Sequence, residues 1–121
     1  MVRELGKTTT LIGSSGKEYT FSLWGFDDFD DVKRTFTGGG LYLFTYRHVV
    51  SGKYKHTYIY LGETDDYYTR YDQHHKEDCI RLHCSNCIGF YSMPDASEDE
   101  RKTAEDDLLE NNDFPCNIVN N

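Results

Sequence analysis

The sequence predicts an α+β fold, in which strands joined by short turns are followed by capped helices. Two observations lead to this prediction. Tyrosine-rich segments flank the turn dipeptide Ser51-Gly52, and helix-start signals follow at Thr64 and Ser97. At 121 residues the chain has the length of one domain with a modest core.

Residues 1–39 are predicted to form an N-terminal extension with a β-hairpin and a short helix. Residues 8–12 and 18–24 have strand character, and the loop between them is rich in glycine and serine. Residues 26–34 begin with acids and end with two basic residues, which is typical of a short helix. We expect the extension to pack on the core; a dimer contact and substrate recognition are the alternatives.

Residues 41–48 and 57–62 are predicted to pair as an antiparallel hairpin. Side chains two residues apart share a face of a strand, which gives each segment an aliphatic side and a tyrosine side. Taken alone, the pattern also fits ordinary packing, because tyrosine and phenylalanine are good strand residues. The tyrosine side comprises Tyr42, Phe44, Tyr46, His48, Tyr58 and Tyr60, and the aliphatic side comprises Leu41, Leu43, Ile59 and Leu61.

A helix is predicted to begin at Thr64 and run to about Lys76, because Thr64 is a good N-cap and two acids follow it. On this helix Arg70 and His74 are four residues apart and would share a face. Arginine can bind a phosphate with several donors, and histidine can move a proton near neutral pH. An exposed helix face with ordinary ion pairs is the alternative.

A second helix is predicted to begin at the capping box formed by Ser97 and Glu100. Arg101 and Glu105 fall within its apolar arc, and a carboxylate on that side needs a partner. The partner could be Arg101, four residues earlier, or a divalent cation such as Mg²⁺. The arc contains Ala104, Leu108 and Leu109, whereas Asp106, Asp107 and Glu110 are expected to point away from it.

Together these segments resemble the GIY-YIG nuclease domain over residues 40–117. The matching positions are Gly40-Leu41-Tyr42, Tyr60-Leu61-Gly62, Arg70, His74, Glu105 and, twelve residues after Glu105, Asn117. Each triplet alone is common, whereas six positions in this order and spacing are specific.

The resemblance implies a nuclease domain over residues 40–121, with a three-stranded antiparallel sheet flanked by helices. Such a domain cuts nucleic acid with a single divalent metal, Mg²⁺ or Mn²⁺. Glu105 would hold the ion that contacts a nonbridging phosphate oxygen and the leaving 3′ oxygen. Asn117 would fix the strand geometry from the C-terminal segment.

The resemblance also assigns roles to the remaining positions. Arg70 would neutralise charge that develops on the phosphate, and Tyr60 would orient the water or the phosphate. Tyr42 would act as, or help create, the general base, with His74 as its proton relay. These roles agree with elementary chemistry, because a phenol with a pKa near ~10 needs a nearby cation or histidine to act as a base.

Three features depart from the commonest pattern of the family. Leucine replaces isoleucine in both triplets, and His74 stands where many members carry tyrosine. The 17 residues between Tyr42 and Tyr60 make a longer hairpin than many members have, which leaves the strand register open. None of these changes removes a required chemical group.

Net charge is the main argument against a nucleic-acid enzyme, because the chain carries −8 and nucleic-acid binding usually rests on a basic surface. Residues 47–83 are balanced, with six basic and six acidic residues, whereas residues 95–113 hold nine of the 21 acids. We therefore expect weak intrinsic affinity. A structured substrate, an accessory DNA-binding partner or a homodimer would compensate for it.

The four cysteines offer a less specific metal site. Cys79, Cys84 and Cys87, with His83 beside them, resemble part of a zinc-ligand set, and Cys116 could supply a fourth sulfur. However, a second Cys-x-x-Cys pair is missing, and Cys87 lies in an apolar run where cysteine usually fills the core. Without zinc we expect four unpaired thiols, as in a reducing compartment.

Two classes of function follow. The favoured one is a metal-dependent endonuclease that acts on DNA, and an RNase is a variant that these residues do not distinguish. The other is a non-catalytic nucleic-acid or protein binding module on the same scaffold. No run approaches the ~18 apolar residues of a membrane span, so we expect a cytoplasmic protein without a membrane partner.

Overall fold

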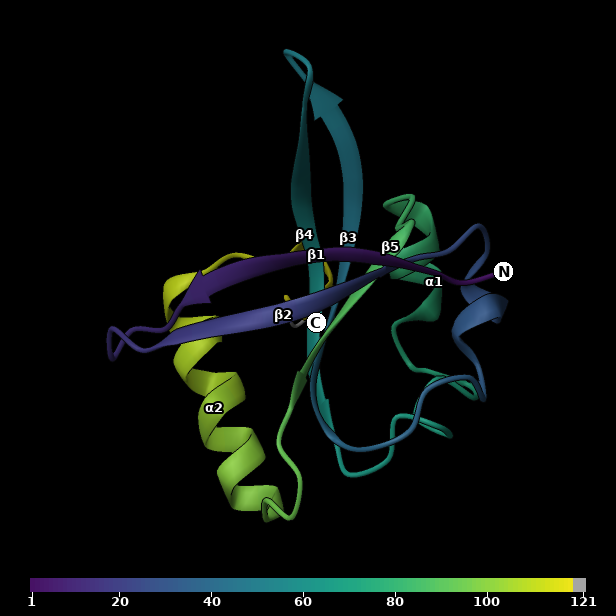
Figure 1. Ribbon diagram of the computed structural model, residues 1–121. Helices are drawn as coiled ribbons and strands as arrows, with labels where there is room; N and C mark the ends of the chain where they lie inside the picture. Colours follow the sequence, from purple (N-terminus) through teal and green to yellow (C-terminus); the bar gives the residue numbers. More distant parts are fainter. Residues whose placement is uncertain (119–121) are drawn as a thin grey trace.

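The computed structural model describes residues 1–118, which form one curled antiparallel sheet with helices on both sides (Figure 1). The strands are β1 (Arg3–Ile12), β2 (Glu18–Gly25), β3 (Gly40–Val50), β4 (Lys53–Thr64) and β5 (Cys87–Ser92). The helices are α1 (Glu77–Leu82) and α2 (Glu98–Asn111), with short 3₁₀ helices η1 (Phe29–Val32) and η2 (Pro115–Asn117). The end of the predicted domain, residues 119–121, lies outside the described residues. No helix among residues 1–118 is both long and apolar enough to cross a membrane.

The sheet has five strands in the order β1-β2-β5-β3-β4, so the predicted three-stranded sheet is wrong. The predicted N-terminal hairpin is present, but it belongs to the same sheet, because β2 pairs with β5 from Ser22↔Phe90 to Gly25↔Cys87. This pairing joins segments that are far apart in the sequence. The strands β5, β3 and β4 are therefore neighbours within a larger sheet.

The β3–β4 hairpin turns at Ser51-Gly52, as the sequence predicts. Both residues have positive φ, at 52° and 76°, which a type I′ turn requires. The pairing contains a bulge: Phe44 pairs with Tyr60 but Thr45 pairs with Tyr58. The bulge reverses the predicted faces of two residues, because Ile59 joins the cluster that contains Tyr42, whereas Tyr58 packs on the opposite cluster.

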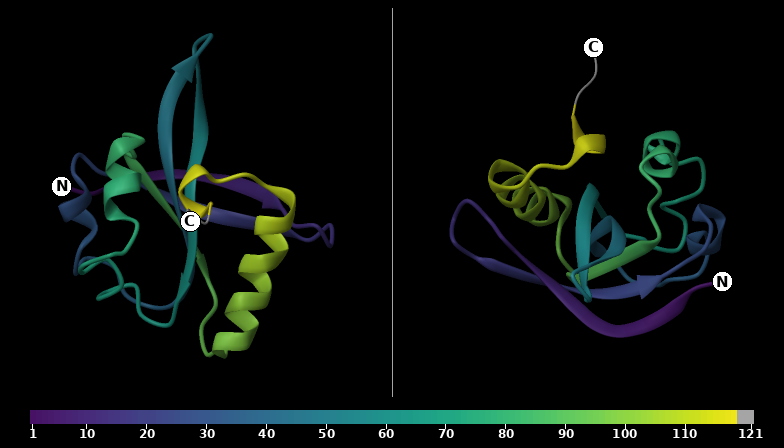
Figure 2. Two further views of the ribbon diagram at one scale, coloured as in Figure 1. Left: turned by 180° about the vertical axis from the view of Figure 1, so that it is seen from behind. Right: turned by 90° about the horizontal axis from the view of Figure 1, so that it is seen from above.

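The two faces of the sheet carry two different cores. α2 covers an aliphatic cluster, while η1, α1 and the segment between β4 and α1 cover an aromatic cluster (Figure 2). The aliphatic cluster includes Leu41, Leu43, Leu61, Ala104 and Leu108. The aromatic cluster includes Phe29, Tyr42, Phe44, Tyr60, Tyr67 and Tyr71. On β3 the aliphatic and tyrosine sides are therefore separated as predicted.

The helix predicted over residues 64–76 is wrong, because residues 67–73 form turns and a regular helix begins only at α1. The hydroxyl of Thr64 accepts a hydrogen bond from the backbone N–H of Asp66 at 3.0 Å. The carboxylate of Asp66 in turn accepts one from the backbone N–H of Tyr68. These are local side-chain turns, which compete with a helix. Gln73 then adopts a positive φ of 52°, which a helix cannot contain.

α2 begins at the predicted capping box. Glu100 N donates to Ser97 Oγ at 3.1 Å, and Ser97 N donates to Glu100 Oε1 at 2.9 Å. Asp107 differs from the prediction, because it does not only face solvent. It accepts hydrogen bonds from Ser15 N at 2.8 Å and Tyr19 Oη at 2.9 Å, which anchors the β1–β2 turn to α2.

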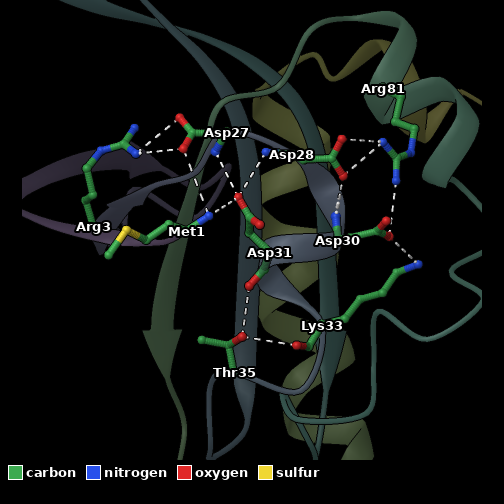
Figure 3. A network of polar contacts seen from close by, with 9 residues as sticks. All are labelled: Met1, Arg3, Asp27, Asp28, Asp30, Asp31, Lys33, Thr35 and Arg81. Atoms are coloured by element: carbon green, nitrogen blue, oxygen red, sulfur yellow. Dashed lines mark hydrogen bonds and ion pairs between the residues drawn. The ribbon is translucent and has the colours of Figure 1, made fainter.

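The acidic segment Asp27–Asp31 is tied to basic groups from neighbouring elements (Figure 3). The Arg81 guanidinium connects α1 to this segment through contacts of 3.2 to 3.3 Å. The other partners in the network are the Met1 amino group, Arg3 and Lys33. These acids therefore stabilise the packing of η1 rather than forming a separate site.

Candidate active site

Tyr42 and His74 form the buried centre of the candidate site. Tyr42 lies in β3 and is 0 % exposed, and its Oη is 2.7 Å from His74 Nε2. His74 precedes α1 and is 5 % exposed. The structure thus joins two residues predicted to act together, although the helix face that Arg70 and His74 were expected to share is absent.

The hydrogen bonds of His74 define its tautomer. Lys76 N donates to His74 Nδ1 at 3.0 Å, so in the neutral ring the hydrogen is on Nε2, which faces Tyr42. Burial lowers the pKa of His74 to about 3, with smaller contributions from the positive charge of Arg70 and from His75 and Lys76. His74 is therefore neutral at pH 7 and donates to the Tyr42 oxygen.

Tyr60 is the outer of the two signature tyrosines. Its ring centroid lies 6.0 Å from that of Tyr42 and 5.2 Å from that of His74, and it is 6 % exposed. Burial raises the pKa of both phenols, and that of Tyr42 rises well above its usual value. Tyr42 has no exposed surface on which a water could be activated directly, whereas Tyr60 retains a small one.

Arg70 brings a positive charge to the same place. Its Cζ lies 5.7 Å from the centroid of the Tyr42 ring, and the side chain is half-buried. It lines an open concavity of about 360 Å³ together with Glu63, Thr64, Asp65, Glu98 and Arg101. Among residues 1–118 no carboxylate forms an ion pair with Arg70. A guanidinium in this position can donate to a phosphate.

Glu105, on α2, is a half-buried carboxylate with no hydrogen bond or ion pair within the described part of the chain. Burial raises its pKa to about 7, and the nearby charges of Glu63 and Asp106 add to this effect. The charge of Arg70 lowers the pKa of Glu105. The pKa of Tyr60 is lowered by Arg70 and raised by Glu105. These three side chains therefore share one electrostatic environment.

The ion pair between Arg101 and Glu63 was missed by the sequence reasoning. Arg101 Nε donates to Glu63 Oε1 at 2.9 Å, and its Nη1 donates to the carbonyl of Ala96 at 2.7 Å. Arg101 consequently does not pair with Glu105, which was the structural alternative. Glu63 directly follows the second signature triplet, and this position is the signal that could have identified it.

Asn117 connects η2 to β4. Its Oδ1 accepts from Leu61 N, its Nδ2 donates to Leu61 O, and both distances are 2.8 Å. β4 is an edge strand, so these bonds satisfy backbone groups that have no neighbouring strand. Asn117 thus holds the backbone between Tyr60 and Gly62, which is the kind of contact that the resemblance implies.

The glycine of the second triplet is required by packing. A Cβ atom on Gly62 would lie 2.3 Å from Cζ of Tyr42, so only glycine lets the Tyr42 ring cross β4. Gly40, in the first triplet, has a φ of 145°, and its Cβ would lie 2.2 Å from the carbonyl oxygen of Tyr91. Both triplets therefore carry a steric requirement as well as a tyrosine.

Cys79 and Cys116 form a disulfide that links α1 to η2, so the prediction of four unpaired thiols is wrong. Their Sγ atoms lie 3.8 Å and 3.6 Å from His83 Nδ1, and these three side chains could hold a metal once the disulfide is reduced. Cys84 is exposed and Cys87 is buried in β5. Within residues 1–118 neither belongs to this group, so the four predicted zinc ligands are not gathered in one place.

The structure gathers Tyr42, Tyr60, Arg70 and His74, and the charge of Glu105 raises the pKa of Tyr60. Comparisons with protein-family models, curated proteins and solved structures find no match for this chain. The resemblance to GIY-YIG nucleases therefore rests on these residues and their arrangement alone.

Proposed function

We propose that this protein is a divalent-metal-dependent endonuclease of the GIY-YIG type, which hydrolyses phosphodiester bonds, preferentially in DNA. One observation supports this most strongly: Glu105 and Arg70 are both half-buried, both without an ion-pair partner among residues 1–118, and both close enough for their charges to shift the pKa of Tyr60. A charge in such a place normally finds a partner. In a nuclease site, a bound cation would be the partner of Glu105 and a bound phosphate would be the partner of Arg70.

The residues fit a hard divalent cation, Mg²⁺ or Mn²⁺. Glu105 would hold it, and Glu63 is a second carboxylate close enough to raise the pKa of Glu105. Mg²⁺ commonly takes one or two carboxylates and keeps several waters. When bound, such an ion supplies Lewis-acid stabilisation of the charge on a phosphate oxygen.

The other side chains have complementary roles in this proposal. Arg70 donates to nonbridging phosphate oxygens and neutralises the charge that grows on them. Tyr60, as the outer phenol, orients the attacking water. His74 donates its Nε2 hydrogen to the Tyr42 oxygen, which leaves the hydroxyl hydrogen of Tyr42 to donate towards Tyr60, and this hydrogen bond lowers the pKa of Tyr60 against the larger raising effect of burial. Tyr42 thus helps to create the general base without contacting water: the Tyr60 oxygen, stabilised as a phenolate by this hydrogen bond and by Arg70, would take the proton of the attacking water.

The proposal is tested by incubating the protein with single-stranded, duplex, nicked and branched DNA and with RNA, in Mg²⁺ or Mn²⁺. We expect cleavage of DNA that EDTA abolishes and that Glu105→Gln reduces at least a hundredfold. Asp106→Asn is the matched control, because it removes an exposed acid one residue along on the same helix and should retain cleavage. Equal activity of the Glu105→Gln variant and the parent would contradict the proposal.

A non-catalytic binding module is the second candidate, and the complete burial of Tyr42 favours it. This function predicts no cleavage across the panel and nucleic-acid or protein binding that Glu105→Gln leaves unchanged. Cleavage of RNA alone would instead assign an RNase on the same residues.

We further propose a cytoplasmic location, with DNA as the main partner and a homodimer or an accessory DNA-binding protein as support. The Cys79–Cys116 disulfide makes this testable, because structural disulfides are rare in the cytosol. Alkylation of the protein in intact cells, followed by mass spectrometry, should modify both cysteines if the location is cytoplasmic. Protection of both would contradict it.

A further inference from the structure

The outer part of the β3–β4 hairpin, residues 46–57, extends beyond the rest of the sheet (Figures 1 and 2). β5 pairs with β3 only from Gly40 to Thr45, whereas β3 and β4 remain paired to the turn. Asn86 holds both backbone groups of Arg47, at 2.7 and 3.0 Å, and so fixes the base of the projecting ribbon. The ribbon beyond this point is about 10 Å long.

This outer hairpin has a charge opposite to that of the molecule. No acidic residue occurs from residue 32 to residue 62, although the chain holds 21 of them. Arg47, Lys53 and Lys55 lie in the outer hairpin, and within residues 1–118 none of them forms an ion pair. By contrast, basic residues such as Lys33 and Arg81 are paired with acids. The outer hairpin is therefore an uncompensated basic surface on an acidic protein.

Aromatic rings alternate with these charges. Tyr46 is 40 % exposed and stacks on His48, with centroids 5.1 Å apart and planes 5° apart. Tyr54 is 62 % exposed, and the Arg47 guanidinium lies 3.6 Å from the centre of its ring. Basic groups that follow a backbone, together with aromatic rings on which bases stack, are the features by which proteins bind single-stranded nucleic acid.

The outer hairpin is also continuous with the candidate site. The extra residue of the bulge is on β4, so β3 keeps its alternation and places Tyr46 and His48 on the same face as Tyr42. Lys55 pairs with His48, and Lys53 with Val50, which puts both lysines on that face. A strand bound along this face would lead towards Tyr60 and Arg70.

We infer that the outer hairpin binds a single-stranded segment of nucleic acid, with Lys53 and Lys55 contacting phosphates and Tyr46 stacking on a base. This inference rests on the proposed function, because it assigns the part of the molecule that holds the substrate. It also explains how an acidic protein can engage a polyanion: binding is confined to one basic projection.

The test is the affinity of the full chain for a fluorescein-labelled 20-nucleotide DNA, measured by anisotropy in EDTA so that metal-dependent cleavage cannot occur. We expect Lys53→Glu/Lys55→Glu to weaken binding at least tenfold. The slope of log Kd against log salt should fall by about 1.4, because each of the two lost phosphate contacts contributes ~0.7 to it. Tyr46→Ala should weaken binding about tenfold through lost stacking.

Lys7→Glu/Lys17→Glu is the matched control, because it makes the same change in net charge at exposed lysines that lie outside the outer hairpin. It should leave the affinity within threefold of that of the parent. An equal loss in this control, or an unchanged affinity in the hairpin variant with an unchanged melting temperature, would overturn the inference. Hairpin-dependent binding to duplex DNA or to phosphatidylserine vesicles, without binding to the single strand, would also overturn it.

The two proposals fail in different ways. Hairpin-dependent binding without cleavage in Mg²⁺ or Mn²⁺ would contradict the proposed nuclease activity and support the proposed binding surface. Cleavage with the same KM in the parent and in the hairpin variant would support the proposed nuclease activity and contradict the proposed binding surface.

Discussion

At the scale of single residues, the charged form of Glu105 lowers the free energy of unfolding of the protein. Its carboxyl group is half-buried beside Glu63 and has a pKa of about 7, against an ordinary value of 4.5. The folded protein therefore holds this proton more tightly than the unfolded chain does. The contribution of Glu105 to the free energy of unfolding is therefore most favourable below pH 4.5, where the carboxyl group is protonated in both states. It is lost as the pH rises through 7, because the folded protein must then hold the charged form.

Glu105→Gln should remove this penalty, because the amide carries no charge at any pH. We expect the variant to be more stable than the parent by about 1–2 kcal/mol at pH 8, after allowance for solvent screening, and equally stable near pH 4.5. Urea denaturation at the two pH values measures the difference. Asp106→Asn should change stability by less than about 0.5 kcal/mol at either pH, and a Glu105→Gln variant no more stable than the parent at pH 8 would contradict the account.

Gly62 is the second residue with a specific consequence. Gly62→Ala places a methyl group 2.3 Å from Cζ of the buried Tyr42 ring and should destabilise the protein by about 1–3 kcal/mol. Gly25→Ala is the control, since its new Cβ would meet only side-chain atoms at 3.4 Å or more. Thermal unfolding of both variants distinguishes a steric effect from a general loss of glycine. Equal melting temperatures for the two would show that the Tyr42 ring can move.

At the scale of elements, local signals in the sequence were sufficient where the structure is local. The Ser51-Gly52 turn and the Ser97–Glu100 capping box form as predicted, because each depends on a few adjacent residues. The bulge at Ile59 could not be predicted, since the alternating pattern of β4 continues through it. The sequence predicts a helix where turns follow Thr64, because an N-cap and a side-chain turn use the same residue types.

Asn117 is the element-scale contact that should matter most for the site. Asn117→Ala removes both hydrogen bonds to Leu61 and should cost about 1–3 kcal/mol. Hydrogen exchange at the Leu61 amide should accelerate, because β4 is an edge strand. Asn111→Ala, which loses one exposed bond to Ile12, is the control and should leave Leu61 unaffected. Unchanged exchange at Leu61 in the Asn117→Ala variant would contradict this role.

At the scale of the whole molecule, contacts between distant segments complete the fold and the site. The pairing of β2 with β5 and the Cys79–Cys116 bond join segments that carry no local signal for each other. Four cysteines allow several pairings, so the sequence could not define this one. The order of the motifs is sufficient to propose the candidate site residues, whereas the ion pair of Glu63 with Arg101 and the burial of Tyr42 required the assembled fold.

The disulfide should contribute substantially to global stability, because it closes a loop with a sequence separation of 37 between α1 and η2. Cys79→Ser/Cys116→Ser should be less stable by about 3–4 kcal/mol, and dithiothreitol should lower the stability of the parent to the same level. Cys84→Ser is the control, because Cys84 is exposed and free. Equal denaturation midpoints for the parent with and without reductant would contradict this contribution.

The position of a bound metal tests the central claim most directly. Anomalous diffraction at the manganese edge, from a crystal soaked in Mn²⁺, locates the ion independently of any activity. A peak is expected at the Glu105 carboxylate, whose pKa is shifted by the charges of Glu63 and Arg70, two residues that line the concavity. A peak elsewhere with none at Glu105, in crystals that leave the concavity open, would contradict the proposed active site.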